Sequence, residues 1–174
     1  KTTQVPQLVL EDAIMRNEGA NCNIICTQPR RISAIGVAER VSDEMCEGQG
    51  RIGKGLVGYQ IRLERRASSA TRLLYCTNGI LLRRLQVDPL LRGVSHIILD
   101  EVHERNVESD FLLIVLRDLL KHRSDLRIVL MSATLNADTF AQYFERAVTT
   151  KGSVPKLHVP GFTFPVDEKF LEEA

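Results

Sequence analysis

The segment Ile97-Ile98-Leu99-Asp100-Glu101 indicates the fold class of this 174-residue chain. A short run of apolar residues without polar alternation predicts a strand that is buried on both faces, as in a parallel sheet covered by helices. The two carboxylates then lie at the carboxyl end of that strand, which is the edge where open α/β sheets bind ligands. An ordinary surface Asp-Glu pair at a strand end is the alternative interpretation.

The rest of the chain alternates short apolar segments with helical patterns, which predicts an α/β domain with a mostly parallel sheet and helices on both faces. The predicted strands are 23–26, 56–61, 73–76, 96–100, 127–131 and 156–159. The predicted helices are 5–16, 32–46, 80–86, 110–121 and 137–145. Ser109 and Asn136 are predicted N-caps, and Gly48 is predicted to end the second helix.

The composition is that of a folded domain, with 44% hydrophobic residues, 26% charged residues and a formal net charge of +1. It excludes disordered, collagen-like and coiled-coil chains. The charge is uneven, because residues 51–93 contain nine basic and two acidic side chains and therefore carry +7. Such a sector can bind a polyanion, although a solvated basic surface explains it equally well.

Four cysteines (Cys22, Cys26, Cys46 and Cys76) lack metal-binding spacing and predict reduced, mostly buried thiols. The N-terminus does not read as a signal peptide, and the longest apolar run is too short to span a membrane. We therefore expect an intracellular protein, in the cytoplasm or the nucleus.

Lys1 and Thr2 precede a predicted helix and match the end of the phosphate-binding loop G-x-x-x-x-G-K-[ST]. In such a loop the lysine reaches the β- and γ-phosphates and the hydroxyl binds Mg²⁺. The glycines are absent from this sequence, so this match says little by itself. Arg30 and Arg31 also stand near a predicted helix start, where guanidinium groups suit either phosphate oxygens or structural carboxylates.

Two hydroxyl side chains, Ser132 and Thr134, follow the predicted strand 127–131 at the same edge of the sheet. Taken alone they are more typical of a turn before the next helix. In the catalytic interpretation of the Asp-Glu pair, one carboxylate holds Mg²⁺ and the other orients a water. The pair by itself is not enough to establish this interpretation, which needs other signals.

Five motifs in order form a specific combination: Lys1-Thr2, Thr27-Gln28-Pro29-Arg30-Arg31, Thr77-Asn78-Gly79, Asp100-Glu101-Val102-His103 and Ser132-Ala133-Thr134. The combination resembles the first RecA-like domain of a DEAH-box helicase of the RNA helicase A-like branch, and it covers nearly the whole chain. The resemblance implies a RecA-like P-loop NTPase fold for 1–159, with the linker or start of a second RecA-like domain at 160–174. It also implies that the first strand and the phosphate-loop glycines are missing from this sequence.

The resemblance implies ATP and Mg²⁺ as cofactors and gives each matching residue a role. ATP-binding residues are Lys1, Thr2, Thr3 and Arg40, of which Arg40 stacks on adenine. The Mg²⁺ ligands are Thr2 and Asp100. Glu101 positions the attacking water, with Asp100 and His103 in the same catalytic motif. The residues that link nucleotide state to domain movement are His103, Ser132 and Thr134. The residues that contact the RNA backbone are Arg30, Arg31, Thr77 and Asn78.

The implied function is that of an ATP-dependent RNA helicase, which couples Mg-ATP hydrolysis to translocation on RNA or to its remodelling. Its implied partners are single-stranded RNA and the second RecA-like domain of the same chain. Because that domain supplies half of the ATP pocket, residues 1–174 alone are expected to lack ATPase activity. A non-hydrolysing RNA-binding scaffold and a DNA translocase of the same superfamily are the alternatives. The intact Lys1, Asp100 and Glu101 favour hydrolysis over the scaffold.

Overall fold

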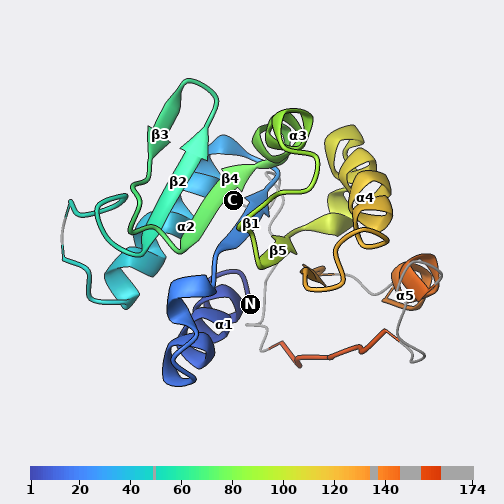
Figure 1. Cartoon of the computed structure of the whole chain (residues 1–174), viewed down its shortest axis with the longest axis horizontal. Helices are drawn as coiled ribbons and strands as arrows, with labels where there is room; N and C mark the ends of the chain where they lie inside the picture. The colour runs from blue at the N-terminus through green and yellow to red at the C-terminus, as the bar shows by residue number, and fades with distance from the viewer. Residues whose placement is uncertain (49, 134–136, 146–153, 162–174) are drawn as a thin grey trace, which may run out of the picture.

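A six-stranded sheet forms the centre of the molecule in the computed structural model, which describes residues 1–48, 50–133, 137–145 and 154–161 (Figure 1). The strand order is β3-β2-β4-β1-β5-β6. The strands are β1 (Ile24–Gln28), β2 (Val57–Ile61), β3 (Glu64–Arg66), β4 (Leu73–Thr77), β5 (His96–Leu99) and β6 (Arg127–Leu130). All neighbouring pairs are parallel except β2 and β3, which form a hairpin. The predicted parallel α/β architecture is confirmed.

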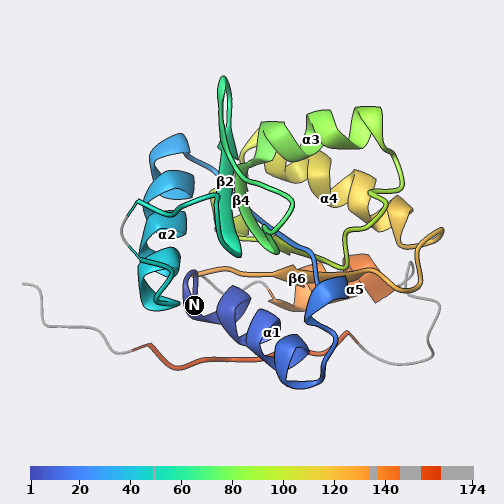
Figure 2. The same ribbon diagram turned by 60° about the vertical axis from the view of Figure 1, so that its left-hand side comes forward.

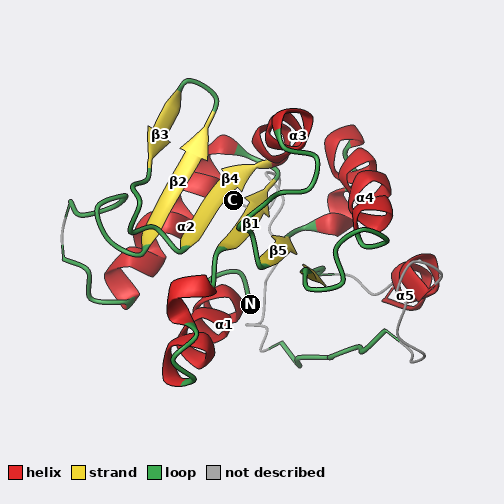
Figure 3. Ribbon diagram, viewed as in Figure 1, coloured by secondary structure: helices red, strands yellow, loops and turns green. Residues whose placement is uncertain are grey.

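Helices cover both faces of this sheet (Figures 2 and 3). They are α1 (Gln4–Met15), α2 (Arg31–Glu44), α3 (Asn78–Val87), α4 (Val107–Leu119) and α5 (Ala137–Glu145), with 3₁₀ turns at Gly19–Asn21 and Val102–Glu104. The side chains of α1 and α2 pack on one face, and those of α3, α4 and α5 pack on the other. None of the helices in the described residues is long and apolar enough to cross a membrane.

Strand β1 shows how the apolar pattern forms two hydrophobic cores. Its residues are all buried, and successive side chains of a strand point to opposite faces of the sheet. Ile24 and Cys26 therefore join the core under α1 and α2, whereas Ile25 joins the core that includes Leu112 of α4. Because β1 pairs in parallel with both β4 and β5, the carboxyl ends of the three strands lie at a common edge.

Helix α4 begins three residues earlier than predicted, because Asn106 and not Ser109 is its N-cap. The Asn106 side chain accepts a hydrogen bond from the Ser109 backbone N–H at 2.8 Å, which satisfies one of the free donors of the first turn. Ser109 is buried instead, with 4% of its surface exposed. The prediction of Ser109 as the cap is therefore wrong, although a cap-forming side chain does start the helix.

Other boundaries also differ from the predictions. Helix α2 ends at Glu44, and Cys46 adopts the left-handed conformation before Gly48 is reached. Residues 156–159 are not a strand. Strand β3 was not predicted, because its charged sequence Glu64-Arg65-Arg66 has no apolar face. The predicted cap Asn136 lies outside the described residues.

Candidate functional site

The start of α1 and the end of β5 meet at the carboxyl edge of the sheet. The Thr2 Oγ1 hydroxyl donates a hydrogen bond of 2.7 Å to Asp100 Oδ2, across 98 residues of sequence. Thr2 precedes α1, whose first turn closes by a bond from the Val5 N–H to the Lys1 carbonyl. Lys1 therefore also lies at this corner, where the N-terminus of a helix favours anionic groups. The structure thus brings two of the predicted site residues, Thr2 and Asp100, into direct contact.

Asp100 is a buried carboxylate held by three donors. Only 1% of its surface is exposed. Besides the Thr2 hydroxyl, the Gln28 side-chain amide donates to Oδ2 at 2.8 Å, and the Glu101 backbone N–H donates to Oδ1 at 2.8 Å. Gln28 was not predicted as a site residue; its signal is a polar side chain at the end of a strand that is buried along its whole length.

The groups beneath Asp100 remain protonated. Burial, followed by the negative charge of Asp100, raises the pKa of the Cys26 thiol well above its ordinary value. Burial also raises the pKa of the Tyr75 hydroxyl, with smaller contributions from Cys26 and Asp100. The Tyr75 hydroxyl donates to the Thr2 carbonyl at 3.4 Å. The Cys26 thiol and the Tyr75 hydroxyl therefore stay neutral beside the Asp100 carboxylate.

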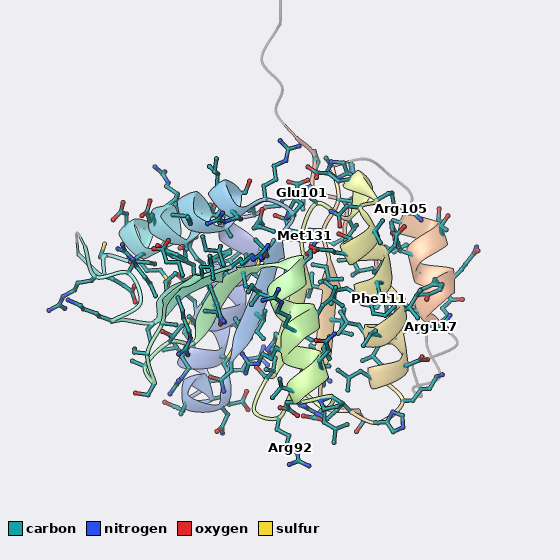
Figure 4. The ribbon with its side chains drawn as sticks, turned by 90° about the horizontal axis from the view of Figure 1, so that it is seen from above. Arg92, Glu101, Arg105, Phe111, Arg117 and Met131 are labelled. Atoms are coloured by element: carbon teal, nitrogen blue, oxygen red, sulfur yellow. The ribbon has the colours of Figure 1, made fainter. Side chains whose placement is uncertain are left out.

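Glu101 follows Asp100 directly and begins a tight turn. Its backbone is left-handed, with φ 55° and ψ 37°, and it caps the 3₁₀ turn Val102–Glu104. The turn is fixed to the end of β6, because the Val102 N–H donates to the Met131 carbonyl. Figure 4 shows Glu101, Met131 and Arg105 toward one end of the molecule. About a quarter of the Glu101 side chain, 28%, is exposed and accessible to a ligand.

His103 lies between Glu101 and the segment after β6. Its Nδ1 is 3.3 Å from Glu101 Oε2, and the Ala133 backbone N–H donates to the same nitrogen at 3.3 Å. A nitrogen that accepts from Ala133 cannot at the same time donate to Glu101, so protonation of Nδ1 selects between the two contacts. The predicted coupling residues are therefore partly brought together, since Ser132 adjoins Ala133 and Thr134 lies outside the described residues.

Thr3 and Arg40 are connected to this corner through Glu44. The Gln7 amide donates both to the Thr3 carbonyl at 3.1 Å and to Glu44 Oε2 at 2.7 Å. Arg40, one turn before Glu44 in α2, donates from its Nε to Glu44 Oε1 at 2.6 Å. The Gln7 and Arg40 hydrogen bonds lower the pKa of the Glu44 carboxyl. Arg40 thus lies on the helix next to the start of α1, with 70% of its side chain exposed.

The predicted RNA-contacting residues follow neighbouring strands. Arg30 and Arg31 follow β1, Thr77 ends β4, and the two strands are parallel with Gln28 opposite Thr77. Both arginines are exposed. Thr77 is half-buried, and its hydroxyl does not cap α3. The structure therefore brings these three residues to one edge, beside the Asp100 corner.

Asn78 differs from the prediction of a backbone contact with RNA. Its side chain is buried, with 1% exposed. Its Nδ2 donates to Ser109 Oγ at 2.8 Å and to Asn106 Oδ1 at 3.4 Å. The amide is therefore used to join the starts of α3 and α4, and the side chain faces the interior rather than a ligand.

The basic sector 51–93 does not form one continuous patch. Arg62, Arg65 and Arg66 belong to the hairpin of β2 and β3. Arg92 lies at the opposite end of the molecule from Glu101 (Figure 4). The +7 charge of this sequence range is thus divided between separate surfaces. One of them is the hairpin, which extends the edge formed by the carboxyl ends of β1 and β4.

This geometry defines a class of protein: an α/β domain in which the carboxyl edge of a mostly parallel sheet, where such folds bind ligands, lies beside a helix N-terminus. The model of the DEAD/DEAH box helicase family matches residues 1–142. The chain belongs to the DEAD/DEAH box helicase family, and its sheet is that of the RecA-like fold.

Several similar proteins carry helicase names. The Arabidopsis thaliana protein named DExH-box ATP-dependent RNA helicase DExH1 is 60% identical over 173 residues, which are 99% of this chain and 16% of that protein. The Homo sapiens protein named putative ATP-dependent RNA helicase DHX57 is 59% identical, over 100% of this chain and 12% of its own length. The Homo sapiens protein named ATP-dependent DNA/RNA helicase DHX36 is 55% identical, over 99% and 16%. The chain thus spans less than a fifth of these relatives.

Proposed function

We propose that this chain is part of the first RecA-like domain of an ATP-dependent RNA helicase and binds Mg-ATP at the corner between α1 and β5. The observation that carries the proposal is the 2.7 Å contact between Thr2 Oγ1 and Asp100 Oδ2. It brings the end of a phosphate-loop motif and the acidic motif to one place, which is what binding of a single ligand by both motifs requires. The helicase names of relatives 55 to 60% identical support the same function.

The chemistry of the two oxygens fits Mg²⁺. This cation prefers oxygen ligands, and two neighbouring oxygens at about 2.1 Å in an octahedral site are about 2.9 Å apart. Thr2 and Asp100 already hold their oxygens at nearly that separation. When bound, Mg²⁺ neutralises charge on the phosphate oxygens. Lys1 then adds its ammonium charge to the phosphates, and the free N–H groups of α1 face them.

Glu101 is the group that orients the attacking water. It is adjacent to Asp100 but has different partners: Asp100 accepts from Thr2 and Gln28, whereas the Glu101 carboxylate lies beside His103. Phosphoryl transfer depends mainly on positioning and charge stabilisation, so a single oriented water suffices. His103 links Glu101 to Ala133, because its Nδ1 lies within 3.3 Å of both the Glu101 carboxylate and the Ala133 N–H.

The RNA backbone follows the carboxyl ends of β1 and β4. The exposed guanidinium groups of Arg30 and Arg31 suit phosphate oxygens. The Thr77 hydroxyl, which does not cap α3, can donate to the same oxygens. Contacts of this kind give affinity without reading the base sequence. A second RecA-like domain of the same polypeptide completes the ATP pocket and closes on it. Closure and release then move RNA, and the protein acts inside the cell, in the cytoplasm or the nucleus.

The substitution Glu101→Gln in the complete polypeptide tests this proposal. The variant is expected to bind ATP normally but to lose at least about 100-fold of RNA-stimulated phosphate release, because an amide, unlike a carboxylate, cannot accept a proton from the water. Glu11→Gln makes the same chemical change on an exposed part of α1 and is expected to retain turnover. Retained hydrolysis in Glu101→Gln would exclude the role of this carboxylate.

A DNA translocase is a second candidate function, since one relative is named a DNA/RNA helicase. Competition between single-stranded RNA and DNA of equal length and sequence, at matched salt, distinguishes the two. Preference for RNA supports the proposal, and preference for DNA supports the alternative. A non-hydrolysing scaffold is excluded if Glu101→Gln lowers the measured turnover.

A further inference from the structure

We propose that Glu104 is a positioning residue: it holds Arg30 in the absence of RNA, and its release shifts the turn that carries Glu101 and His103. This inference rests on the proposed contact of Arg30 with RNA. It adds to that function a physical route by which an RNA phosphate regulates hydrolysis.

The first observation is an ion pair between the proposed RNA surface and the catalytic turn. Arg30 Nη2 lies 3.3 Å from Glu104 Oε1, although the residues are 74 positions apart. The Arg30 side chain is 73% exposed and that of Glu104 is 32% exposed. An incoming phosphate can therefore reach the guanidinium, and it must compete with the carboxylate for it. An exposed pair of this kind is weak enough to be displaced.

The second observation is the construction of the turn. Glu104 ends the 3₁₀ turn that Glu101 begins, and the Glu104 N–H donates to the Glu101 carbonyl at 3.0 Å. Two left-handed residues, Glu101 and Arg105, bound this turn, with φ of 55° and 48°. A residue other than glycine rarely adopts this conformation without support from its surroundings. The turn is thus a short unit whose two ends depend on external contacts, and the Arg30 pair is one of them.

The third observation is that the segment after the turn is fixed. Asn78 binds Ser109 and Asn106 from inside the fold, and Arg105 donates to both carboxylate oxygens of Asp110 at 2.9 and 3.1 Å. With α4 held in this way, loss of the Arg30 pair does not shift the helix. The change is confined to the turn, where Glu101 and His103 are located.

The free energies of the two events are linked, so the effect has a defined sign. If RNA must break the Arg30–Glu104 pair to bind, then removing the Glu104 charge strengthens RNA binding by the factor that the pair had cost. For an exposed pair that factor is about 1.5 to 5. Without RNA, the Glu104 variant then resembles the RNA-bound state of the unmodified enzyme. Its basal ATPase rate therefore rises, and the stimulation of that rate by RNA falls by a similar factor.

The test uses Glu104→Gln in the complete polypeptide, with a uridine oligonucleotide as the probe. Fluorescence anisotropy measures the dissociation constant, and phosphate release measures hydrolysis with and without the oligonucleotide. Asp12→Asn is the matched control, because it removes one carboxylate charge from another exposed pair, with Arg16 at 3.0 Å on α1. We expect tighter binding and lower stimulation for Glu104→Gln only. Unchanged or weaker binding, or an equal effect of Asp12→Asn, would overturn the inference.

The variant Arg30→Ala separates this inference from the function on which it rests. If Arg30→Ala leaves the affinity for the oligonucleotide unchanged, the proposed RNA contact is wrong and the inference falls with it. If Arg30→Ala weakens binding while Glu104→Gln has no effect, only the inference is wrong. In the double variant, the effect of Glu104→Gln must disappear, because its partner is absent. An effect that persists would indicate a purely structural role for Glu104.

Discussion

Replacement of Gln28 by Met is a direct test of how the proposed magnesium site is built. Gln28 touches neither the phosphates nor the water in the proposed mechanism; its amide donates to the Asp100 carboxylate at 2.8 Å. Methionine has nearly the same length and volume, so the packing around the end of β1 is kept while the donor is lost. The perturbation therefore removes one of the three donors to Asp100 and little else.

The expected size of the effect follows from burial. Gln28 is 2% exposed and Asp100 is 1% exposed, so water cannot replace the lost donor. A hydrogen bond to a buried charged group contributes about 1.5–3 kcal/mol, and Gln28→Met should lower the free energy of unfolding by that amount. Groups that orient a metal ligand typically change metal affinity by about 10- to 100-fold when removed. The Mg²⁺ concentration for half-maximal hydrolysis should rise by that factor.

The assay is RNA-stimulated phosphate release by the complete polypeptide as a function of free Mg²⁺. Excess Mg²⁺ should restore the rate, because Thr2 and Asp100 are still present. Gln60→Met makes the same change on β2, where the side chain is half-buried, and should leave the Mg²⁺ requirement unchanged. An unchanged requirement in Gln28→Met, or a lost rate that excess Mg²⁺ fails to restore, would refute this account of the site.

Two further predictions concern the fold. Leu112→Ala should lower the free energy of unfolding by about 2–5 kcal/mol, because the Leu112 side chain of α4 is fully buried. Phe111→Ala, at a neighbouring residue that is 54% exposed, should lower it much less. Shifts of the urea midpoint measure both changes, and equal shifts would contradict the packing. A thiol reagent at pH 8 should modify Cys46 first, because this cysteine is exposed. Cys76 and Cys26 should react later, because burial raises the pKa of Cys76 to about 12 and that of Cys26 well above its ordinary value. Mass spectrometry of the native protein gives the order of labelling, and early labelling of Cys26 would contradict the prediction.

The sequence predicted the sheet well, because the information needed is local. Apolar runs such as Ile97-Ile98-Leu99 report burial on both faces without knowledge of their neighbours. The same reasoning failed where a partner decides the structure. Strand β3 exists because the turn after β2 folds the charged segment back onto it, with Tyr59 opposite Arg66. Asn106 caps α4, although Ser109 is an equally good capping residue, because Asn78 provides a use for Ser109 inside the fold.

The site was predictable as a set of motifs but not as a set of contacts. Asp100, Glu101 and Thr2 carry their chemistry in their own side chains, so the residue type and order were enough to select them. Gln28 and Glu104 have no such signature, since each acts on a neighbour that only the fold supplies. A glutamine at a strand end becomes informative once β1 and β5 are known to be adjacent and in register. Residues that position others can therefore be found only after the sheet order is known. In this fold Gln28 and Glu104 lie between the proposed nucleotide corner and the proposed RNA edge, on the route that coupling between the two would take.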